Sequence, residues 1–251
     1  MPKTKEGYLT AANGAKLAYV KTTGLSPGII FLGGYMSDMT GIKAQALENF
    51  CKRTNRSFIR FDYQGHGAST GSFELGTIST WTLDVLEIID SLSSGPQILV
   101  GSSMGGWIML LAALQRKLLV SGLIGIAAAT DFTKRLREKE LTASQLLELE
   151  QTGLTHIESP YSEAPYIFTK TLLEDGQTRL LLDKPINLDC PVRLIHGMKD
   201  TSVPWQNSLK LAETLRSPDI EVTLIKNGDH RLSDPAAIDK MLQAIESIIS
   251  R

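Results

Sequence analysis

A serine framed by two glycines is the first candidate for chemistry in this sequence. It is Ser103, within residues 101–105 (G-S-S-M-G), which have the pattern G-x-S-x-G. An apolar run precedes this segment and a helical pattern follows it, so Ser103 is predicted to occupy a sharp strand-to-helix turn that exposes its hydroxyl. Ser102 is a weaker candidate, because only Ser103 has glycine at both second neighbours. The alternative interpretation is a glycine-rich turn without a chemical role.

A serine hydroxyl needs a base before it becomes an effective nucleophile. The candidates are the four histidines, His66, His156, His196 and His230. His230 is the best placed, because it follows the last predicted strand and can reach Ser103 from the carboxyl edge of a parallel sheet. His196, at the end of the preceding strand, is predicted to be a core histidine with a hydrogen-bonded ring. His156 falls in a separate insertion, and His66 precedes the serine.

An acid that orients the base is expected in the loop after the preceding strand. Asp200 lies in that loop, within residues 196–200 (H-G-M-K-D). A carboxylate there can accept the Nδ1–H of His230, fix the tautomer of the ring and stabilise the imidazolium. Asp131, which follows an earlier strand, is the rival acid. Asp229 adjoins His230, and its side chain is expected to point away from that ring.

Acyl transfer also needs two backbone N–H groups that face the developing oxyanion. One is expected from Met104, the residue after the serine, and the other from the loop of residues 33–36 (G-G-Y-M). We assign the second donor to Tyr35, with Gly34 as the alternative. The turn of residues 60–69 (R-F-D-Y-Q-G-H-G-A-S) is interpreted as architecture, stabilised by hydrogen bonds between side chains and backbone.

Charge and motif content exclude several other classes of protein. The chain has 251 residues with 26 basic and 27 acidic side chains and shows no basic stripe, so no nucleic-acid partner is expected. It contains no H-E-x-x-H, no Cys/His cluster and no phosphate-binding glycine motif, and we therefore expect neither a metal nor a cofactor. No apolar run is long enough to insert stably into a membrane. The two isolated cysteines and the lack of a signal peptide predict a cytoplasmic protein.

Apolar runs that alternate with helical patterns predict a mostly parallel, twisted sheet with helices on both faces. A hairpin comes first, with residues 7–11 and 16–21 on either side of the turn dipeptide Asn13-Gly14. The predicted core strands are residues 28–32, 57–61, 97–100, 122–126, 192–195 and 221–225, and the predicted helices are residues 41–53, 80–92, 104–115, 205–215 and 236–249.

More than sixty residues separate the fourth and fifth of these core strands, far more than a crossover connection needs. We expect residues 1–129 and 188–251 to form one core, and residues 130–187 to form a helical lid, here called the lid insertion. The segment 142–145 (T-A-S-Q) is a capping-box signature for one of its helices. Leucines together with Tyr161, Tyr166 and Phe168 predict that the lid insertion covers an apolar acyl pocket.

These motifs together resemble the α/β-hydrolase superfamily. The D-x-x-G-x-G-x-S turn, the G-x-S-x-G segment, the G-x-x-D loop and the late histidine all carry that resemblance. A more specific similarity is to the group of abhydrolases known as palmitoyl-protein thioesterases and mycophenolic acid acyl-glucuronide esterases. The segments that carry it are residues 31–37 (FLGGYMS), 61–63 (FDY), 95–103 (GPQILVGSS), 105–107 (GGW), 190–191 (CP), 196–200 (HGMKD), 203–205 (VPW) and 229–231 (DHR).

The resemblance implies a serine hydrolase that cleaves ester or thioester bonds of small-molecule or acyl-protein substrates through an acyl-enzyme. Its site would be the triad of Ser103, Asp200 and His230, which the residues themselves predict. The sequence shows no mitochondrial presequence, so a bacterial or cytoplasmic relative is expected. The alternatives are a serine peptidase or amidase, a cofactor-free C–C hydrolase on the same triad, and a non-catalytic binding protein with this fold. A serine nucleophile argues against the aspartate-based haloalkane dehalogenases and epoxide hydrolases.

Overall fold

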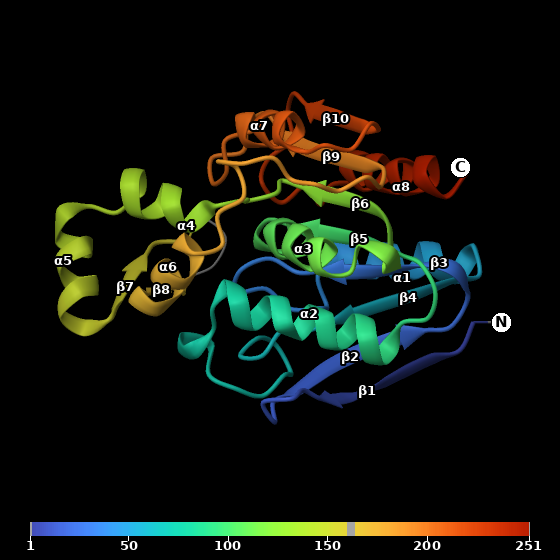
Figure 1. The fold of residues 1–251 in the computed structure, drawn as a ribbon, viewed down its shortest axis with the longest axis horizontal. Helices are drawn as coiled ribbons and strands as arrows, with labels where there is room; N and C mark the ends of the chain where they lie inside the picture. Colours follow the sequence, from blue (N-terminus) through green and yellow to red (C-terminus); the bar gives the residue numbers. More distant parts are fainter. Residues whose placement is uncertain (1, 160–163, 251) are drawn as a thin grey trace.

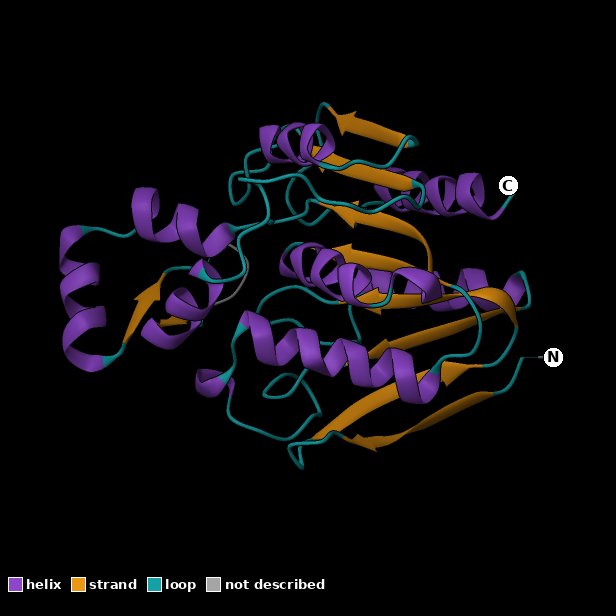
Figure 2. Cartoon of the chain, in the orientation of Figure 1, coloured by secondary structure: helices purple, strands orange, loops and turns teal. Residues whose placement is uncertain are grey.

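The computed structural model describes residues 2–159 and 164–250, and a single large sheet organises them. The sheet has eight strands in the order β1-β2-β4-β3-β5-β6-β9-β10. The six strands β4, β3, β5, β6, β9 and β10 are parallel to one another, whereas β2 pairs antiparallel with both β1 and β4. The predicted mostly parallel sheet is therefore confirmed, and Figures 1 and 2 show helices on both of its faces.

The elements follow the predicted rhythm, with differences of a few residues at their ends. The strands are β1 (Thr4–Thr10), β2 (Lys16–Thr22), β3 (Leu25–Leu32), β4 (Arg56–Phe61), β5 (Gln97–Ser102), β6 (Val120–Ile126), β7 (Leu154–Ile157), β8 (Tyr166–Thr169), β9 (Val192–Gly197) and β10 (Ile220–Ile225). The helices are α1 (Ile42–Arg53), α2 (Ile78–Leu92), α3 (Met104–Gln115), α4 (Phe132–Arg135), α5 (Ala143–Thr152), α6 (Lys170–Gln177), α7 (Gln206–Thr214) and α8 (Pro235–Ile249). Short 3₁₀ turns lie at Phe73–Leu75 and Lys117–Leu119, and a π-helical turn lies at Leu136–Glu140.

The core lies in two layers, one on each face of the sheet. Residues of α2, α3 and α7 pack on one face, together with apolar residues of the lid insertion. Residues of α1 and α8 pack on the other face (Figure 1). Every residue of β5 and β9 is buried, which explains why these strands are mostly apolar, although β9 also contains the buried Arg193 and His196.

The lid insertion stands beyond the carboxyl ends of the parallel strands, at the end of the molecule opposite both termini (Figure 1). It contains the helices α4, α5 and α6. The capping box at the start of α5 is present, because the Thr142 side chain accepts from the backbone of Gln145 and the Gln145 side chain accepts from that of Thr142. The insertion lies at the sheet edge where the predicted site residues gather (Figure 1).

The lid insertion also contains a two-stranded sheet that the sequence analysis missed. Strands β7 and β8 pair antiparallel, from Leu154 opposite Thr169 to Ile157 opposite Tyr166. Gly153 adopts a left-handed conformation with φ of 82°, which ends α5, so Leu154 belongs to a strand and not to the preceding leucine-rich helix. Of the predicted lid aromatics, Tyr161 lies outside the described residues.

We predict that the substitution Gly105→Ala destabilises the protein. A Cβ atom at Gly105 would lie 2.3 Å from the carbonyl oxygen of Leu32 and 2.5 Å from that of Gly33, because the start of α3 packs directly on the end of β3. The free energy of unfolding is expected to fall by about 1–3 kcal/mol, measured by chemical denaturation. Gly41→Ala is the control, since its Cβ would have its nearest neighbour at 3.8 Å. Equal losses in the two variants would contradict this packing argument.

Candidate active site

Ser103 lies in a strained turn between β5 and α3, as the G-x-S-x-G pattern predicts. Its φ of 52° and ψ of −119° are unfavourable for a residue that carries a Cβ. Backbone hydrogen bonds hold this conformation, because the N–H of Ser103 donates to the carbonyl of Ile126 at 2.9 Å and its own carbonyl accepts from Ala129 at 3.0 Å. The turn presents the serine hydroxyl above the carboxyl edge of the sheet.

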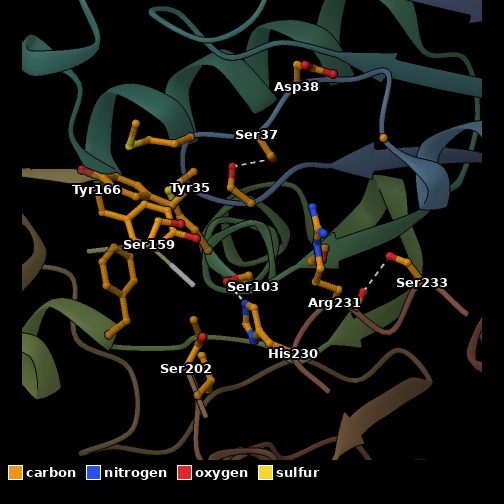
Figure 3. Close-up of a pocket in the computed structure, with 18 of the residues that line it drawn as sticks. Tyr35, Ser37, Asp38, Ser103, Ser159, Tyr166, Ser202, His230, Arg231 and Ser233 are labelled. Atoms are coloured by element: carbon orange, nitrogen blue, oxygen red, sulfur yellow. Dashed lines mark hydrogen bonds between the residues drawn. The ribbon is translucent and has the colours of Figure 1, made fainter. Parts of the chain in front are cut away.

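The structure brings Ser103, His230 and Asp200 together in one chain of hydrogen bonds. His230 Nε2 lies 3.1 Å from Ser103 Oγ, and His230 Nδ1 lies 2.7 Å from Asp200 Oδ2. Figure 3 shows the ring of His230 directed at the serine hydroxyl. The Asp200 side chain is fully buried, whereas 14% of the His230 side chain is exposed. Asp200 is therefore shielded from water, while part of the His230 side chain remains accessible.

The loops that carry the acid and the base are fastened to each other. The N–H of Met198 donates to the carbonyl of Ile225 at 2.9 Å, and the N–H of Lys199 donates to that of Gly228 at the same distance. These bonds join the end of β9 to the end of β10. The separation between Asp200 and His230 is thus determined by the edge of the sheet and not by flexible loops.

Asp200 is an anion that four N–H groups surround. Its Oδ1 accepts from the backbone of Ser202 and Val203, both at 2.8 Å, and its Oδ2 accepts from the rings of His196 and His230. Burial would raise the pKa of Asp200, but the hydrogen bonds from His196 and His230 outweigh it and hold that pKa well below its usual value. Because the pKa is lowered in the folded state, the carboxylate stabilises the fold at neutral pH, and this contribution is lost as the pH falls through the lowered pKa.

The other acidic candidates do not reach His230. Asp131 accepts backbone hydrogen bonds from Leu181 and Leu182, each at 2.9 Å, and so ties the beginning of the lid insertion to its end. Asp229 caps the turn that follows His230, because it accepts from the N–H of Leu232 at 2.9 Å. Asp131, the rival acid, therefore has a structural role and does not make the contact with His230 that the acid of a triad would make.

The loop after β3 lies beside the serine, where the second oxyanion donor was predicted. A Cβ at Gly34 would lie 3.4 Å from that of Ser103, so the loop backbone passes close to this serine. Within residues 2–159 and 164–250, the backbone N–H groups of Tyr35 and Met104 have no protein acceptor. Both residues line the same cavity as Ser103. The role of these two N–H groups as oxyanion donors remains a prediction.

The side chain of Tyr35 has a role that the sequence analysis missed. Its hydroxyl donates to the carbonyl of Ile167 in β8, and its ring stacks on Phe168 with centroids 5.0 Å apart and planes 2° apart. Burial raises the pKa of this hydroxyl, so it stays protonated and remains a donor. Tyr35 therefore fastens the loop after β3 to the lid insertion. The aromatic residues of the lid insertion, noted in the sequence, could have suggested that an aromatic side chain of the core packs against them.

The remaining histidines are placed as the sequence predicts, with one contact that was missed. His66 is buried against Phe73 and Trp81, and burial lowers its pKa to about 4. His156 is exposed on β7. His196 is fully buried with its ring hydrogen-bonded, but one of its partners is Asp200 itself. The turn of residues 60–69 is architectural, because Asp62 accepts from the backbone of nearby loops.

A cavity of about 750 Å³ opens above Ser103 and His230. The lid insertion lines one part of it, here called the apolar end, with Phe132, Ile157 and Phe168, and also contributes the charged side chains of Arg135, Glu140 and Glu158. The loop after β3, the start of α1 and the loop after β10 line the part here called the polar end, where most side chains are polar or charged. In Figure 3, Tyr35 and Tyr166 lie on one side of the serine, and Arg231 and Ser233 lie on the other. In the described part of the chain, no three His, Cys, Asp or Glu side chains gather to hold a metal ion.

Comparison with known proteins shows the family of this chain. A model described as "Alpha/beta hydrolase family" matches residues 29–241. The chain belongs to the alpha/beta hydrolase family. It is 44% identical to human "Palmitoyl-protein thioesterase ABHD10, mitochondrial" over 99% of this chain and 81% of the human protein. These matches confirm the predicted fold, the resemblance and the assignment to hydrolases of ester or thioester bonds.

Solved structures agree with this assignment. The alpha/beta hydrolase domain-containing protein 10 from mouse superposes with a TM-score of 0.91 at 43% identity, with 98% of each chain covered. A putative hydrolase from Agrobacterium vitis S4 superposes with a TM-score of 0.93 at 40% identity, with 99% of each chain covered. Est1E from Butyrivibrio proteoclasticus, in a structure with bound ferulic acid, is 21% identical and shares the fold with a TM-score of 0.76.

The location of the protein in the cell remains a prediction. The names of the mammalian relatives place them in mitochondria, so these relatives do not confirm the expected cytoplasmic location. Over residues 2–159 and 164–250, every helix is too short or too polar to cross a membrane.

Alanine at the two candidate acids should separate their roles. Asp131→Ala leaves the N–H groups of Leu181 and Leu182 unpaired, and we expect it to lower the free energy of unfolding by roughly 2 kcal/mol while the folded enzyme keeps its turnover. Asp200→Ala removes the partner of His230, and its kcat is expected to fall on the order of 10⁴-fold. Both are measured by denaturation and by ester hydrolysis. The reverse pattern would make Asp131 the acid.

Proposed function

We propose that this protein is a serine hydrolase that cleaves carboxylic ester or thioester bonds through an acyl-enzyme. Ser103 is the nucleophile, His230 the general base and Asp200 the acid that orients it. The observation that carries this proposal is the unbroken chain of hydrogen bonds from Ser103 through His230 to Asp200, on a strained turn at the floor of a cavity.

In the first half of the reaction, His230 Nε2 takes the proton of Ser103 Oγ as the oxygen attacks the acyl carbonyl. The negative charge of Asp200 stabilises the imidazolium that forms. Collapse of the tetrahedral intermediate breaks the bond to the alcohol or thiol, and His230 returns the proton to that leaving group. In the second half, His230 activates a water molecule, which releases the carboxylic acid and regenerates the serine.

The oxyanion of both tetrahedral intermediates is proposed to bind the N–H groups of Tyr35 and Met104. Their lack of protein acceptors in the described residues supports this role, as does the position of both residues beside Ser103. The Met104 N–H lies in the first turn of α3, where the helix dipole also favours negative charge. Donors that are already in place need no reorganisation when the charge develops.

The shape and lining of the cavity support an acyl substrate. We propose that the acyl chain binds under the lid insertion, residues 130–187, between Phe132, Ile157 and Phe168, while the leaving group faces the polar end. The remainder of the chain, residues 1–129 and 188–251, forms the catalytic core. The relatives named palmitoyl-protein thioesterases suggest a long acyl chain on a protein thiol as one substrate class. A small-molecule ester fits the same arrangement.

Loss of the nucleophile is the direct test of this function. Ser103→Ala should lower kcat at least about 10³-fold on p-nitrophenyl esters and acyl thioesters, because no acyl-enzyme can form. The wild type is assayed over a series of acyl chain lengths, and its optimum measures the depth of the apolar end. Ser102→Ala is the matched control and should retain turnover. A folded wild type without any turnover would contradict the proposed function and favour a non-catalytic binding protein with this fold.

Filling the apolar end of the cavity should shorten the preferred acyl chain. Ile157 lines the cavity from β7, so Ile157→Trp is expected to lower kcat/KM for long acyl chains at least about tenfold and to leave acetyl substrates little changed. His156→Trp is the control, because neighbouring residues of a strand point to opposite faces and His156 is exposed. An unchanged chain-length profile in Ile157→Trp would contradict the proposed acyl site.

A further inference from the structure

One oxygen of the proposed catalytic acid serves two histidines. Asp200 Oδ2 lies 2.7 Å from His230 Nδ1 and 3.0 Å from His196 Nε2. His196 in turn lies 2.7 Å, through its Nδ1, from the hydroxyl of Ser208 in α7. The triad therefore continues beyond its acid, in the order Ser103, His230, Asp200, His196, Ser208.

The surroundings of His196 determine which of its ring nitrogens carries the proton. Its Nε2 has two neighbours, Asp200 Oδ2 and the carbonyl of Val203, both at 3.0 Å, and both can only accept. Nε2 is therefore protonated. In the neutral ring, Nδ1 is then an acceptor, and the Ser208 hydroxyl donates to it. Both side chains are fully buried, so water does not compete for these bonds.

We propose that His196, locked in one tautomer by Ser208, is a positioning residue that holds the Asp200 carboxylate and shares its charge, so that Asp200 orients His230 without keeping it protonated. This inference rests on the proposed triad function. It assigns to His196 and Ser208 an influence on the base, although neither of them contacts substrate.

The physical reason is competition for one oxygen. The Nε2–H of His196 draws electron density from the same Oδ2 that accepts the Nδ1–H of His230. Oδ2 therefore holds the His230 imidazolium less strongly than it would with His230 as its only ring partner. Since only neutral His230 can accept the serine proton, His196 extends the active range of the enzyme toward lower pH. It also holds the carboxylate from β9, whereas His230 belongs to the loop after β10.

The other charged groups near this chain remain the same in the variants tested. Arg135 from α4 donates to the carbonyl of Ser202, beside Asp200, at 2.7 Å. Asp229 and Arg231 flank His230, and Lys43 from α1 donates to the carbonyl of Arg231. The charged side chains of α7, Lys210 and Glu213, are exposed, as is Glu221 of β10. A change in the pH profile can therefore be assigned to the replaced donor.

The test compares variants that keep or remove the N–H donor at position 196. His196→Leu removes it, and His196→Gln places an amide N–H near the same point. Ser208→Ala keeps the ring but removes the hydroxyl that polarises it. Ser217→Ala is the matched control, because its hydroxyl is likewise largely buried but donates to the carbonyl of Cys190, away from the site. The readouts are the pH dependence of kcat/KM and the NMR titration of the His230 ring.

We expect the acidic limb of the kcat/KM profile to move to higher pH by about half a unit or more in His196→Leu. Ser208→Ala should move it in the same direction by less, because the weakened donor remains. His196→Gln and Ser217→Ala should keep the wild-type limb. A limb that stays in place, or moves to lower pH, in both His196→Leu and Ser208→Ala would overturn the proposal, even if kcat falls.

The NMR titration separates this inference from the proposed function. It reports the protonation midpoint of His230 in the resting protein and does not need turnover. If Ser103→Ala retains activity, the proposed function fails, and the shift of the His230 midpoint still decides the role of His196. If His196→Leu does not fold, the comparison of Ser208→Ala with Ser217→Ala decides it, and equal midpoints in those two variants overturn the proposal.

Discussion

The close approach of α3 to the ends of β3 and β5 is the constraint on which the site depends. Gly101 and Gly105 have no room for a Cβ, because the backbones around the turn are in contact. This crowding, with the bonds from Ser103 to Ile126 and Ala129, holds the serine in a backbone conformation with positive φ that is otherwise costly. The same contact places the loop after β3 beside the nucleophile. Turn strain and oxyanion geometry thus have one common cause.

The second organising element is the buried charge of Asp200. A carboxylate without solvent is unfavourable unless hydrogen-bond donors surround it, and here two backbone and two ring N–H groups do so. These donors come from β9, from the loop that follows it and from the loop after β10. The hydrogen bonds that stabilise the buried Asp200 carboxylate therefore also orient His230. The stability of this edge of the sheet and the geometry of the proposed triad are thus linked.

Much of the site could be predicted because parallel strands bring their carboxyl ends to one edge, where Ser103, Asp200 and His230 each follow an apolar run. The contacts between side chains were harder to predict. The contact of His196 with Asp200 depends on the exact path of the loop between them, and that of Tyr35 with β8 joins segments far apart in the sequence. Strand β7, and with it the pairing to β8, was missed because a leucine-rich helix precedes β7 directly, and Gly153 is a weak local signal of the change.

Asp131 has a consequence for how such enzymes diverge. By accepting the N–H groups of Leu181 and Leu182, it brings the two ends of the lid insertion together at the point where the insertion leaves the core. The chain therefore leaves the core and returns to it at one place, and Tyr35 and Ser79 of the core contact the insertion further along. Residues between the two ends can therefore differ among related chains, and with them the lining of the cavity, while the points where the insertion joins the core stay in place.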